Sequence, residues 1–336
     1  MAKVPKEPLQ PAGTNHPQDF LLKATDLKCY FPLRKGLWSR VVGYIKAFDG
    51  VSFGVDRGET FGLVGETGCG KSTTARLIMG LDRPREGSME FEGRNLLAQK
   101  GLELRRMRRQ IQMVFQDPYS SLDPRQRIGT IIGEPLAVFR EGSKRERTDR
   151  IHELLDLVGL DKNYAKRYPH ELSGGQRQRI GIARALALHP QLVICDEPVS
   201  ALDVSIQSQI LNLLMDLQSR LGLAYFFISH DLNIVRHICD RVAVMYLGKI
   251  VEMGRREDIF KHPAHPYTEA LLSALPSPHP DQRKKRILLK GEVPSPLNPP
   301  SGCRFHPRCP SAQARCYEEE PDPHSVGEHV VACFRA

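Results

Sequence analysis

The chain has no long apolar segment. No run approaches the ~18 consecutive apolar residues that a membrane-spanning helix needs. The N-terminus also lacks the apolar run, about 7–15 residues long, that marks a signal peptide. We therefore expect a cytosolic protein with at most a peripheral membrane role. Because cytosolic thiols are kept reduced, its eight cysteines are poor disulfide candidates.

The composition excludes fewer classes of protein. Hydrophobic residues make up 40% and charged residues 26% of 336 residues, which leaves room for a full core and a second, smaller unit. The net charge is +9. A basic balance suits nucleic acid, an anionic membrane surface or phosphate ligands, and it does not choose among them.

One glycine-rich stretch fits the phosphate-loop pattern G-x-x-x-x-G-K-[ST] at every required position. It lies between a predicted buried strand, 60–64, and a predicted helix, 72–79. Its glycines let backbone N–H groups converge on phosphates, Lys71 adds a cation, and the Ser72 hydroxyl can bind Mg²⁺. The flanking strand and helix disfavour the alternative of a plain turn. The predicted nucleotide-binding residues are Gly65, Glu66, Gly68, Cys69, Gly70, Lys71, Ser72 and Thr73.

Polar side chains end three further predicted strands. Asp196 and Glu197 follow a buried strand, at the position where ligands bind in open α/β sheets. Asp196 can hold Mg²⁺, and Glu197 can polarise an attacking water. Gln116 ends the strand that starts at Ile111. His230 follows the strand 224–229. A lone histidine after a strand is more often structural than catalytic, but His230 lies at the same sheet edge as Glu197, which favours a role in the site.

A second helix start also suits anions. In the run Leu-Ser-Gly-Gly-Gln, Ser173 fits the N-cap, Gly174 and Gly175 open the backbone, and Gln176 completes the run. An amphipathic helix with a core-facing stripe follows Asp203 and ends at Gly222.

The remaining predicted elements carry few candidate functional residues. Tyr30 and Phe31, at the end of the first strand, are candidates for stacking on adenine, although core packing explains them equally well. Proline-rich stretches after Lys261 indicate a linker around one short helix. The other predictions are a flexible tail at 1–20, strands at 21–31 and 51–56, an edge strand at 88–91, a solvated basic helix at 101–109, and helices over 128–167.

Four cysteines cluster near the C-terminus with the spacing C-x₅-C-x₆-C-x₁₆-C: Cys303, Cys309, Cys316 and Cys333. Few apolar residues accompany them, so a metal would replace the missing core. Four thiolates suit Zn²⁺ or an iron–sulfur cluster, but the gaps miss the C-x₂₋₄-C knuckle of zinc ribbons. Free thiols remain an alternative.

The motif set over about 21–260 resembles the nucleotide-binding subunits of ABC transporters, with Leu172-Ser-Gly-Gly-Gln176 the most specific stretch. The resemblance implies a P-loop NTPase fold of the α/β class. It has a mixed sheet, an antiparallel β subdomain, a helical subdomain at about 117–180, and here a small Cys-rich C-terminal extension at 261–336.

Roles for single residues follow from the same resemblance. Glu197 is the general base, Gln116 and Asp196 serve Mg²⁺ and the γ-phosphate, and His230 is the switch histidine. Asp203 lies at the dimer interface, and Phe31 or Tyr30 stacks on adenine. Two subunits meet head to tail, so each ATP lies between one chain's phosphate loop and the other chain's Ser173 helix.

The C-terminal runs HPYTEALLSALP, GEVPSPLNPP and GCRFHPRC narrow the resemblance to dipeptide and oligopeptide importers, and within them to the second, F-type ATPase. This implies a heterodimer with a second ATPase, two permease subunits, an extracytoplasmic peptide-binding protein, and a peripheral position on the cytoplasmic face of the inner membrane. It also favours a [4Fe-4S] cluster over Zn²⁺. Alternatives are import of nickel or another solute, and a DNA-repair or chromosome-type ATPase; no nucleic acid partner is expected.

Overall fold

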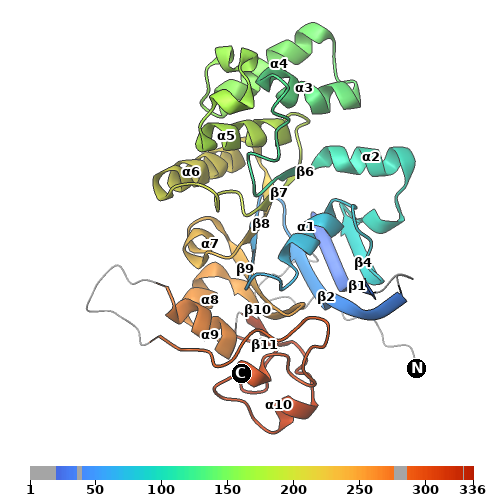
Figure 1. The fold of residues 1–336 in the computed structure, drawn as a ribbon, viewed down its shortest axis with the longest axis vertical. Helices are drawn as coiled ribbons and strands as arrows, with labels where there is room; N and C mark the ends of the chain where they lie inside the picture. Colours follow the sequence, from blue (N-terminus) through green and yellow to red (C-terminus); the bar gives the residue numbers. More distant parts are fainter. Residues whose placement is uncertain (1–19, 36–39, 276–285, 328) are drawn as a thin grey trace. The chain divides into compact units, whose positions relative to one another are not determined.

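The computed structural model describes residues 20–35, 40–275, 286–327 and 329–336 (Figure 1). These residues form two compact units. Unit 1 contains the described residues of 1–56, 60–98 and 229–336, and unit 2 contains 57–59 and 99–228. The predicted N-terminal tail lies outside the described residues except for Phe20.

An antiparallel sheet in unit 1 has the strand order β2-β1-β4-β5. The strand β4 lies between β1 and β5, so the prediction of an edge strand at 88–91 was wrong. Strands β1 and β2 also extend beyond the predictions of 21–31 and 51–56. Of the added residues, 32–35 and 40–42 are exposed, whereas Ala47 and Phe48 are buried. The bounds are β1 Leu22–Lys35, β2 Arg40–Val55, β4 Glu86–Phe91 and β5 Arg94–Asn95.

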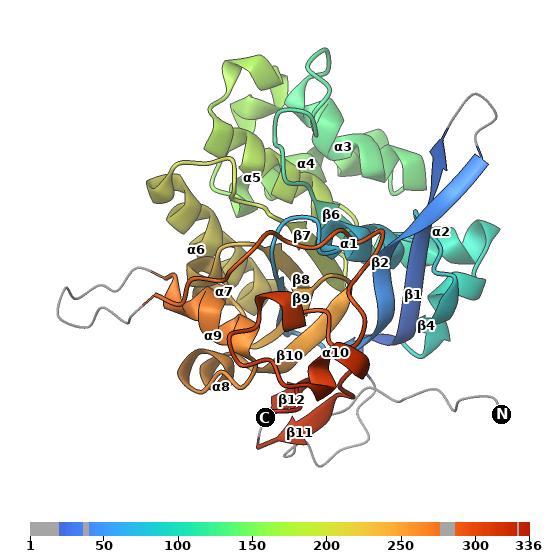
Figure 2. The same cartoon turned by 60° about the horizontal axis from the view of Figure 1, so that its bottom comes forward.

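A second sheet in unit 1 is mixed, as predicted. Its order is β11-β12-β10-β9-β3, with β3 parallel to β9 and the other pairs antiparallel. The strand β12 pairs with β10, so the end of the chain belongs to this sheet (Figure 2). The bounds are β3 Thr60–Val64, β9 Arg241–Tyr246, β10 Lys249–Arg255, β11 His324–Val326 and β12 His329–Val331.

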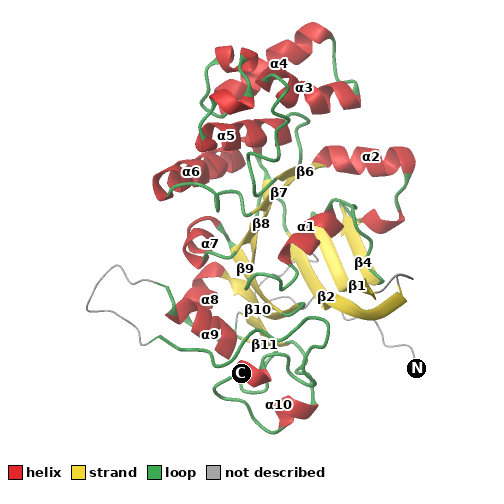
Figure 3. Cartoon of the chain, in the orientation of Figure 1, coloured by secondary structure: helices red, strands yellow, loops and turns green. Residues whose placement is uncertain are grey.

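Short helices complete unit 1. The predicted linker contains one of them, α9, whose Tyr267 is completely buried, so this part packs on the core. Much of the chain after α9 is loop (Figure 3). The bounds are α1 Lys71–Ile78, α7 Leu232–Ile238, α8 Arg256–Lys261, α9 Pro266–Ser273, α10 Arg315–Glu318 and the 3₁₀ helices η1 Leu96–Ala98 and η5 His306–Arg308.

Unit 2 combines a parallel sheet, in the order β8-β7-β6, with a helical part in which α3, α4 and α5 contact one another. The central strand β7 is buried throughout, which explains its unbroken apolar sequence. The bounds are β6 Ile111–Val114, β7 Leu192–Asp196, β8 Ala224–Ser229, α2 Gly101–Gln110, α3 Ile128–Phe139, α4 Lys144–Leu157, α5 Gly174–Ala185, α6 Val204–Leu221, η2 Lys162–Lys166 and η3 Pro169–Glu171.

Two predictions for unit 2 are confirmed locally. The basic run forms α2, where the exposed Arg106 pairs with Glu103 at 2.6 Å on the helix surface. The helix α6 buries Ile210, Leu214 and Leu217 of its apolar stripe, while Leu221 at its end is exposed, and it ends at Gly222, which has φ +65°. Among the described helices, none has the length and apolar character needed to cross a bilayer.

Candidate functional site

The phosphate loop joins β3 to α1 in unit 1. Two of its glycines are required by close packing. A Cβ on Gly65 would lie 2.2 Å from the carbonyl oxygen of Met245, and one on Gly70 would lie 2.4 Å from that of Ala47. No side chain therefore fits at either position, and the loop can approach the neighbouring backbone closely.

Lys71 is the first residue of α1, and its side chain is buried. Its ammonium donates hydrogen bonds to the carbonyl oxygens of Gly65, at 2.7 Å, and of Glu66, at 3.0 Å. The cation is therefore folded over the loop in which phosphate would bind.

The helix α1 has no side-chain cap, because its N-cap residue is Gly70. Ordinarily a side-chain oxygen or another acceptor satisfies the first N–H groups of a helix. The helix dipole and Lys71 both favour an anion at this start of α1. Around it, Gly68 has φ +84°, Cys69 is buried, Ser72 is exposed and Thr73 is half-buried.

The two aromatic candidates differ in their surroundings. The Tyr30 hydroxyl donates to the Asp49 carboxylate, and the Arg85 guanidinium lies 5.7 Å from the Tyr30 ring centroid. Phe31 is the next residue of the same strand and pairs with Ile45. Because successive strand residues point to opposite faces, at most one of the two can stack on a given adenine.

In unit 2 the structure brings two predicted residues together. The Gln116 side-chain amide donates to the Glu197 carboxylate at 2.8 Å. Glu197 has φ +45°, a conformation that costs a non-glycine residue about 1–3 kcal/mol and that clusters at functional sites. Asp196, one residue earlier, is buried at the end of β7.

The second helix start caps itself. The Ser173 hydroxyl accepts from the Gln176 N–H at 3.3 Å, and the Gln176 side chain accepts from the Ser173 N–H at 3.0 Å. Gly175 packs on α6, where a Cβ would lie 2.6 Å from Ile206, and Gly174 leaves more room, 3.3 Å from Leu202. The exposed Ser173 is thus held in place at the N-terminus of α5.

Two predicted residues lie at element ends and are exposed. Asp203 is the N-cap residue of α6, and no hydrogen bond from the helix caps its side chain. His230 lies between β8 and α7 in unit 1.

The four clustered cysteines line one small cavity of about 20 Å³. Burial, with smaller contributions from the three other cysteines, raises the pKa of the Cys303 thiol to about 11. Within the described residues, no group of three or more His, Cys, Asp or Glu side chains is arranged to hold a metal ion. The predicted iron–sulfur cluster is therefore not shown by the structure, although all four cysteines line one cavity.

Sequence reasoning missed three residues near the phosphate loop. The Tyr267 hydroxyl accepts the Glu66 N–H at 3.1 Å, and Arg308 pairs with the Glu66 carboxylate at 2.7 Å. Arg304 pairs with Asp49, beside Tyr30. The only feature of the sequence that points to Arg304 and Arg308 is their spacing, four residues apart in the Cys303–Cys309 run.

The central part of the chain matches a known family of proteins. Residues 48–200 match the family described as ABC transporter. Among solved structures, the dimeric ATP-binding cassette MJ0796 bound to ADP and Pi covers 70% of this chain and 98% of its own, with a TM-score of 0.62 and 29% identity. The fold is therefore that of an ABC ATPase.

A second match is more specific. Residues 251–316 match the family described as oligopeptide/dipeptide transporter, C-terminal region. The oligopeptide transport ATP-binding protein AppF of Bacillus subtilis is 52% identical over 94% of this chain and 97% of its own length. The dipeptide transport ATP-binding protein DppF of Escherichia coli is 50% identical over 94% and 95%. The chain belongs to this family of peptide-transport ATP-binding proteins.

Proposed function

We propose that the chain is the ATP-binding and ATP-hydrolysing subunit that powers import of dipeptides or oligopeptides. The observation that carries this function is the 52% identity to a peptide-transport ATP-binding protein across almost the whole of both chains. Family membership also favours transport over the DNA-repair alternative.

The phosphate loop is the proposed binding site for the ATP phosphates. Its glycines, the uncapped start of α1 and the buried Lys71 support this assignment. On binding, the Lys71 ammonium exchanges its two loop carbonyl oxygens for phosphate oxygens. Mg²⁺ neutralises charge on the phosphates when bound, and its proposed protein ligands are Ser72, Gln116 and Asp196.

Glu197 is the proposed general base. Its hydrogen bond to Gln116 and its positive φ support a carboxylate held in one orientation for an attacking water. His230 is proposed to contact the γ-phosphate, as the family resemblance implies, and Tyr30 or Phe31 to stack on adenine.

The subunit is proposed to work in a pair with a second, homologous ATPase. Ser173, Gly174, Gly175, Gln176 and Asp203 then face the nucleotide held by the partner, and MJ0796, which is dimeric with ADP and Pi, supports such an arrangement. Two permeases and an extracytoplasmic peptide-binding protein complete the complex, on the cytoplasmic face of the inner membrane. Native mass spectrometry of the detergent-purified complex should find this chain with a different ATPase; two copies of this chain would contradict the heterodimer.

Peptide uptake tests the function. Cells lacking this gene should recover uptake of labelled di- and tripeptides with the wild type but not with Glu197→Gln. The matched control is Glu153→Gln, on the exposed side of α4. Normal peptide uptake in the deletion strain would redirect the proposal to nickel or another solute.

A [4Fe-4S] cluster on Cys303, Cys309, Cys316 and Cys333, with Zn²⁺ as the alternative, is a separate proposal. Its support is the chemistry of the donor set and the one cavity that the four thiols line. Protein purified anaerobically should contain iron or zinc, which Cys309→Ala removes and Cys29→Ala, in β1, retains. Absence of both metals from the wild type would refute this proposal.

A further inference from the structure

The turn from Cys303 to Cys309, which belongs to unit 1, contains two arginines with nearly buried side chains. The side chains of Arg304 and Arg308 are only 8% and 9% exposed. Between them, Phe305 is buried against the rings of Tyr246 and Tyr267, at centroid distances of 5.2 and 5.4 Å. The aromatic anchor thus fixes the turn and directs both guanidinium groups.

Arg308 makes a two-pronged contact with the phosphate loop. Its two terminal nitrogens donate to the two Glu66 carboxylate oxygens at 2.7 and 3.2 Å. The hydrogen bond that Arg308 donates to Glu66 is the main reason that the pKa of Arg308 is raised, against the opposing effect of burial. This planar pairing fixes geometry as well as charge.

Glu66 is also held through its backbone. Its N–H donates to the Tyr267 hydroxyl at 3.1 Å, while its carbonyl oxygen accepts from Lys71 at 3.0 Å. Residues of α9 and of the Cys303–Cys309 turn therefore contact the loop residue that follows Gly65.

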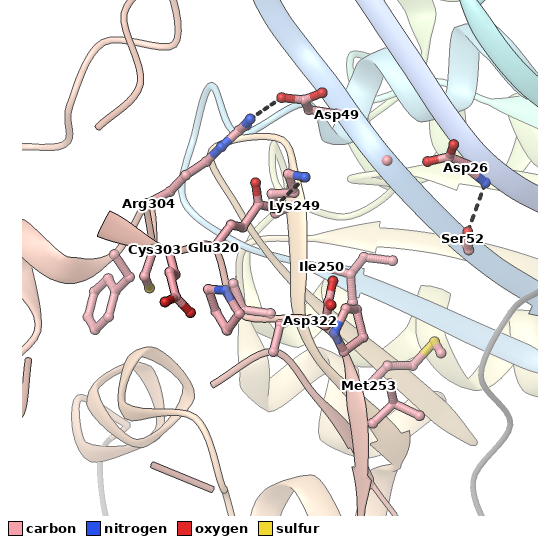
Figure 4. Close-up of a pocket in the computed structure, with 18 of the residues that line it drawn as sticks. Asp26, Asp49, Ser52, Lys249, Ile250, Met253, Cys303, Arg304, Glu320 and Asp322 are labelled. Atoms are coloured by element: carbon pink, nitrogen blue, oxygen red, sulfur yellow. Dashed lines mark hydrogen bonds and ion pairs between the residues drawn. The ribbon is translucent and has the colours of Figure 1, made fainter. Parts of the chain in front are cut away.

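Arg304 anchors the same turn at a second place. It pairs with Asp49, which also accepts the Tyr30 hydroxyl, and it donates to the Leu247 carbonyl oxygen. Figure 4 shows Arg304 reaching Asp49 at the border of a cavity of about 850 Å³. Burial raises the pKa of Asp49, but the bond from Tyr30 and the nearby cations outweigh it, so the pKa is lowered.

A carboxylate in a phosphate loop works against its ligand. ATP brings several negative charges to the loop, and an unpaired Glu66 would repel them. Among the residues that the structure describes, Arg308 forms the ion pair with this carboxylate. The loop N–H groups must also stay within about 0.5 Å of their binding geometry, which a fixed Glu66 assists.

We propose that Arg308 is a positioning residue for the phosphate loop, which neutralises and holds Glu66 so that nucleotide affinity depends on the Cys303–Cys309 turn. The inference rests on the proposed function, in that it takes the loop as the ATP site. It gives the C-terminal segment a part in nucleotide binding by the same chain.

Calorimetric titration of the full chain with MgATP tests this. Arg308→Ala should raise the Kd about tenfold, because Glu66 is then uncompensated beside the ligand. Arg308→Lys keeps the charge but loses the planar guanidinium, so its Kd should lie between those of the wild type and Arg308→Ala. The matched control is Arg315→Ala, which removes an exposed pair with Glu319 in the same segment and should leave the Kd unchanged.

The double variant Glu66→Gln/Arg308→Ala separates this role from a merely structural one. With the repelling charge removed, its Kd should return to within about twofold of the wild type. A Kd for Arg308→Ala equal to that of the wild type, in a protein with an unchanged thermal unfolding curve, would overturn the proposal. A double variant as weak as Arg308→Ala would do so too. If Lys71→Ala binds MgATP as well as the wild type, the proposed ATP site itself fails instead.

Discussion

The starts of α1 and α5 suit anions in opposite ways. At α1 the N-cap residue is Gly70, so no side chain caps the helix, and Lys71 is buried against its own loop. At α5 the N-cap is Ser173, which forms a reciprocal capping box with Gln176. We therefore propose the start of α1 as a phosphate-binding site and the start of α5 as a surface that contacts a ligand held by another subunit. We infer that α1 binds ATP in the isolated chain, whereas α5 acts only on a nucleotide held by another subunit.

The largest expected effect on ATP binding is at α1. Lys71→Ala should weaken ATP binding at least about 100-fold, because charge-assisted hydrogen bonds contribute about 1.5–3 kcal/mol each. Fluorescence titration with a labelled ATP analogue measures this. The matched control is Lys144→Ala, since Lys144 is likewise the first residue of a helix, but of the Ser143-capped α4. Equal losses in both variants would remove the distinction between open and capped helix starts.

A change at Glu197 should impair ATP hydrolysis without impairing ATP binding. Glu197→Gln is expected to lower ATP turnover by about 10²–10⁴-fold, the usual contribution of a general base, with ATP still bound. Phosphate release by the assembled complex is the measurement. Turnover close to that of the wild type would remove Glu197 as the base.

A smaller effect is expected at the start of α5. Ser173→Ala should lower turnover of the assembled complex by up to about 100-fold through misplaced contacts. It should also cost about 1 kcal/mol of stability through the lost cap. Ser143→Ala removes the same kind of capping box from α4, so it should reproduce the stability loss and leave turnover intact. A loss of turnover in both variants would show that stability alone is responsible.

The smallest effects concern packing under α5. Gly175→Ala would bring a Cβ to 2.6 Å from Ile206, an overpacking that costs about 1–3 kcal/mol. Gly181→Ala on the same helix meets no atom within 4 Å outside the helix backbone, and it should stabilise by about 0.4–1 kcal/mol. Urea unfolding measures both; equal shifts would show that α5 does not pack tightly on α6.

The sequence predicted the parts of the candidate site that local pattern controls. The glycines around Lys71, the strand that ends at Asp196 and the serine at the start of α5 follow from short-range rules of turns, burial and capping. The sequence predicted Gln116 and Glu197 at the ends of two strands, but the hydrogen bond between them is a finding of the structure.

Contacts between distant segments were not predictable in this way. Arg308 lies 242 residues from Glu66 and Arg304 lies 255 residues from Asp49, and no periodic pattern links such positions. The pairing of β12 with β10 was missed for the same reason. The four cysteines, whose spacing suggested a metal, line one cavity without the arrangement of a metal site.

One titration tests the comparison most directly. MgATP binding to the isolated chain is measured for the wild type, Ser173→Ala and Lys71→Ala under one set of conditions. We predict that Ser173→Ala binds ATP like the wild type while Lys71→Ala does not bind it. If Ser173→Ala loses affinity as strongly as Lys71→Ala, the start of α5 contributes to ATP binding within its own chain, and the division of roles between the two helix starts is wrong.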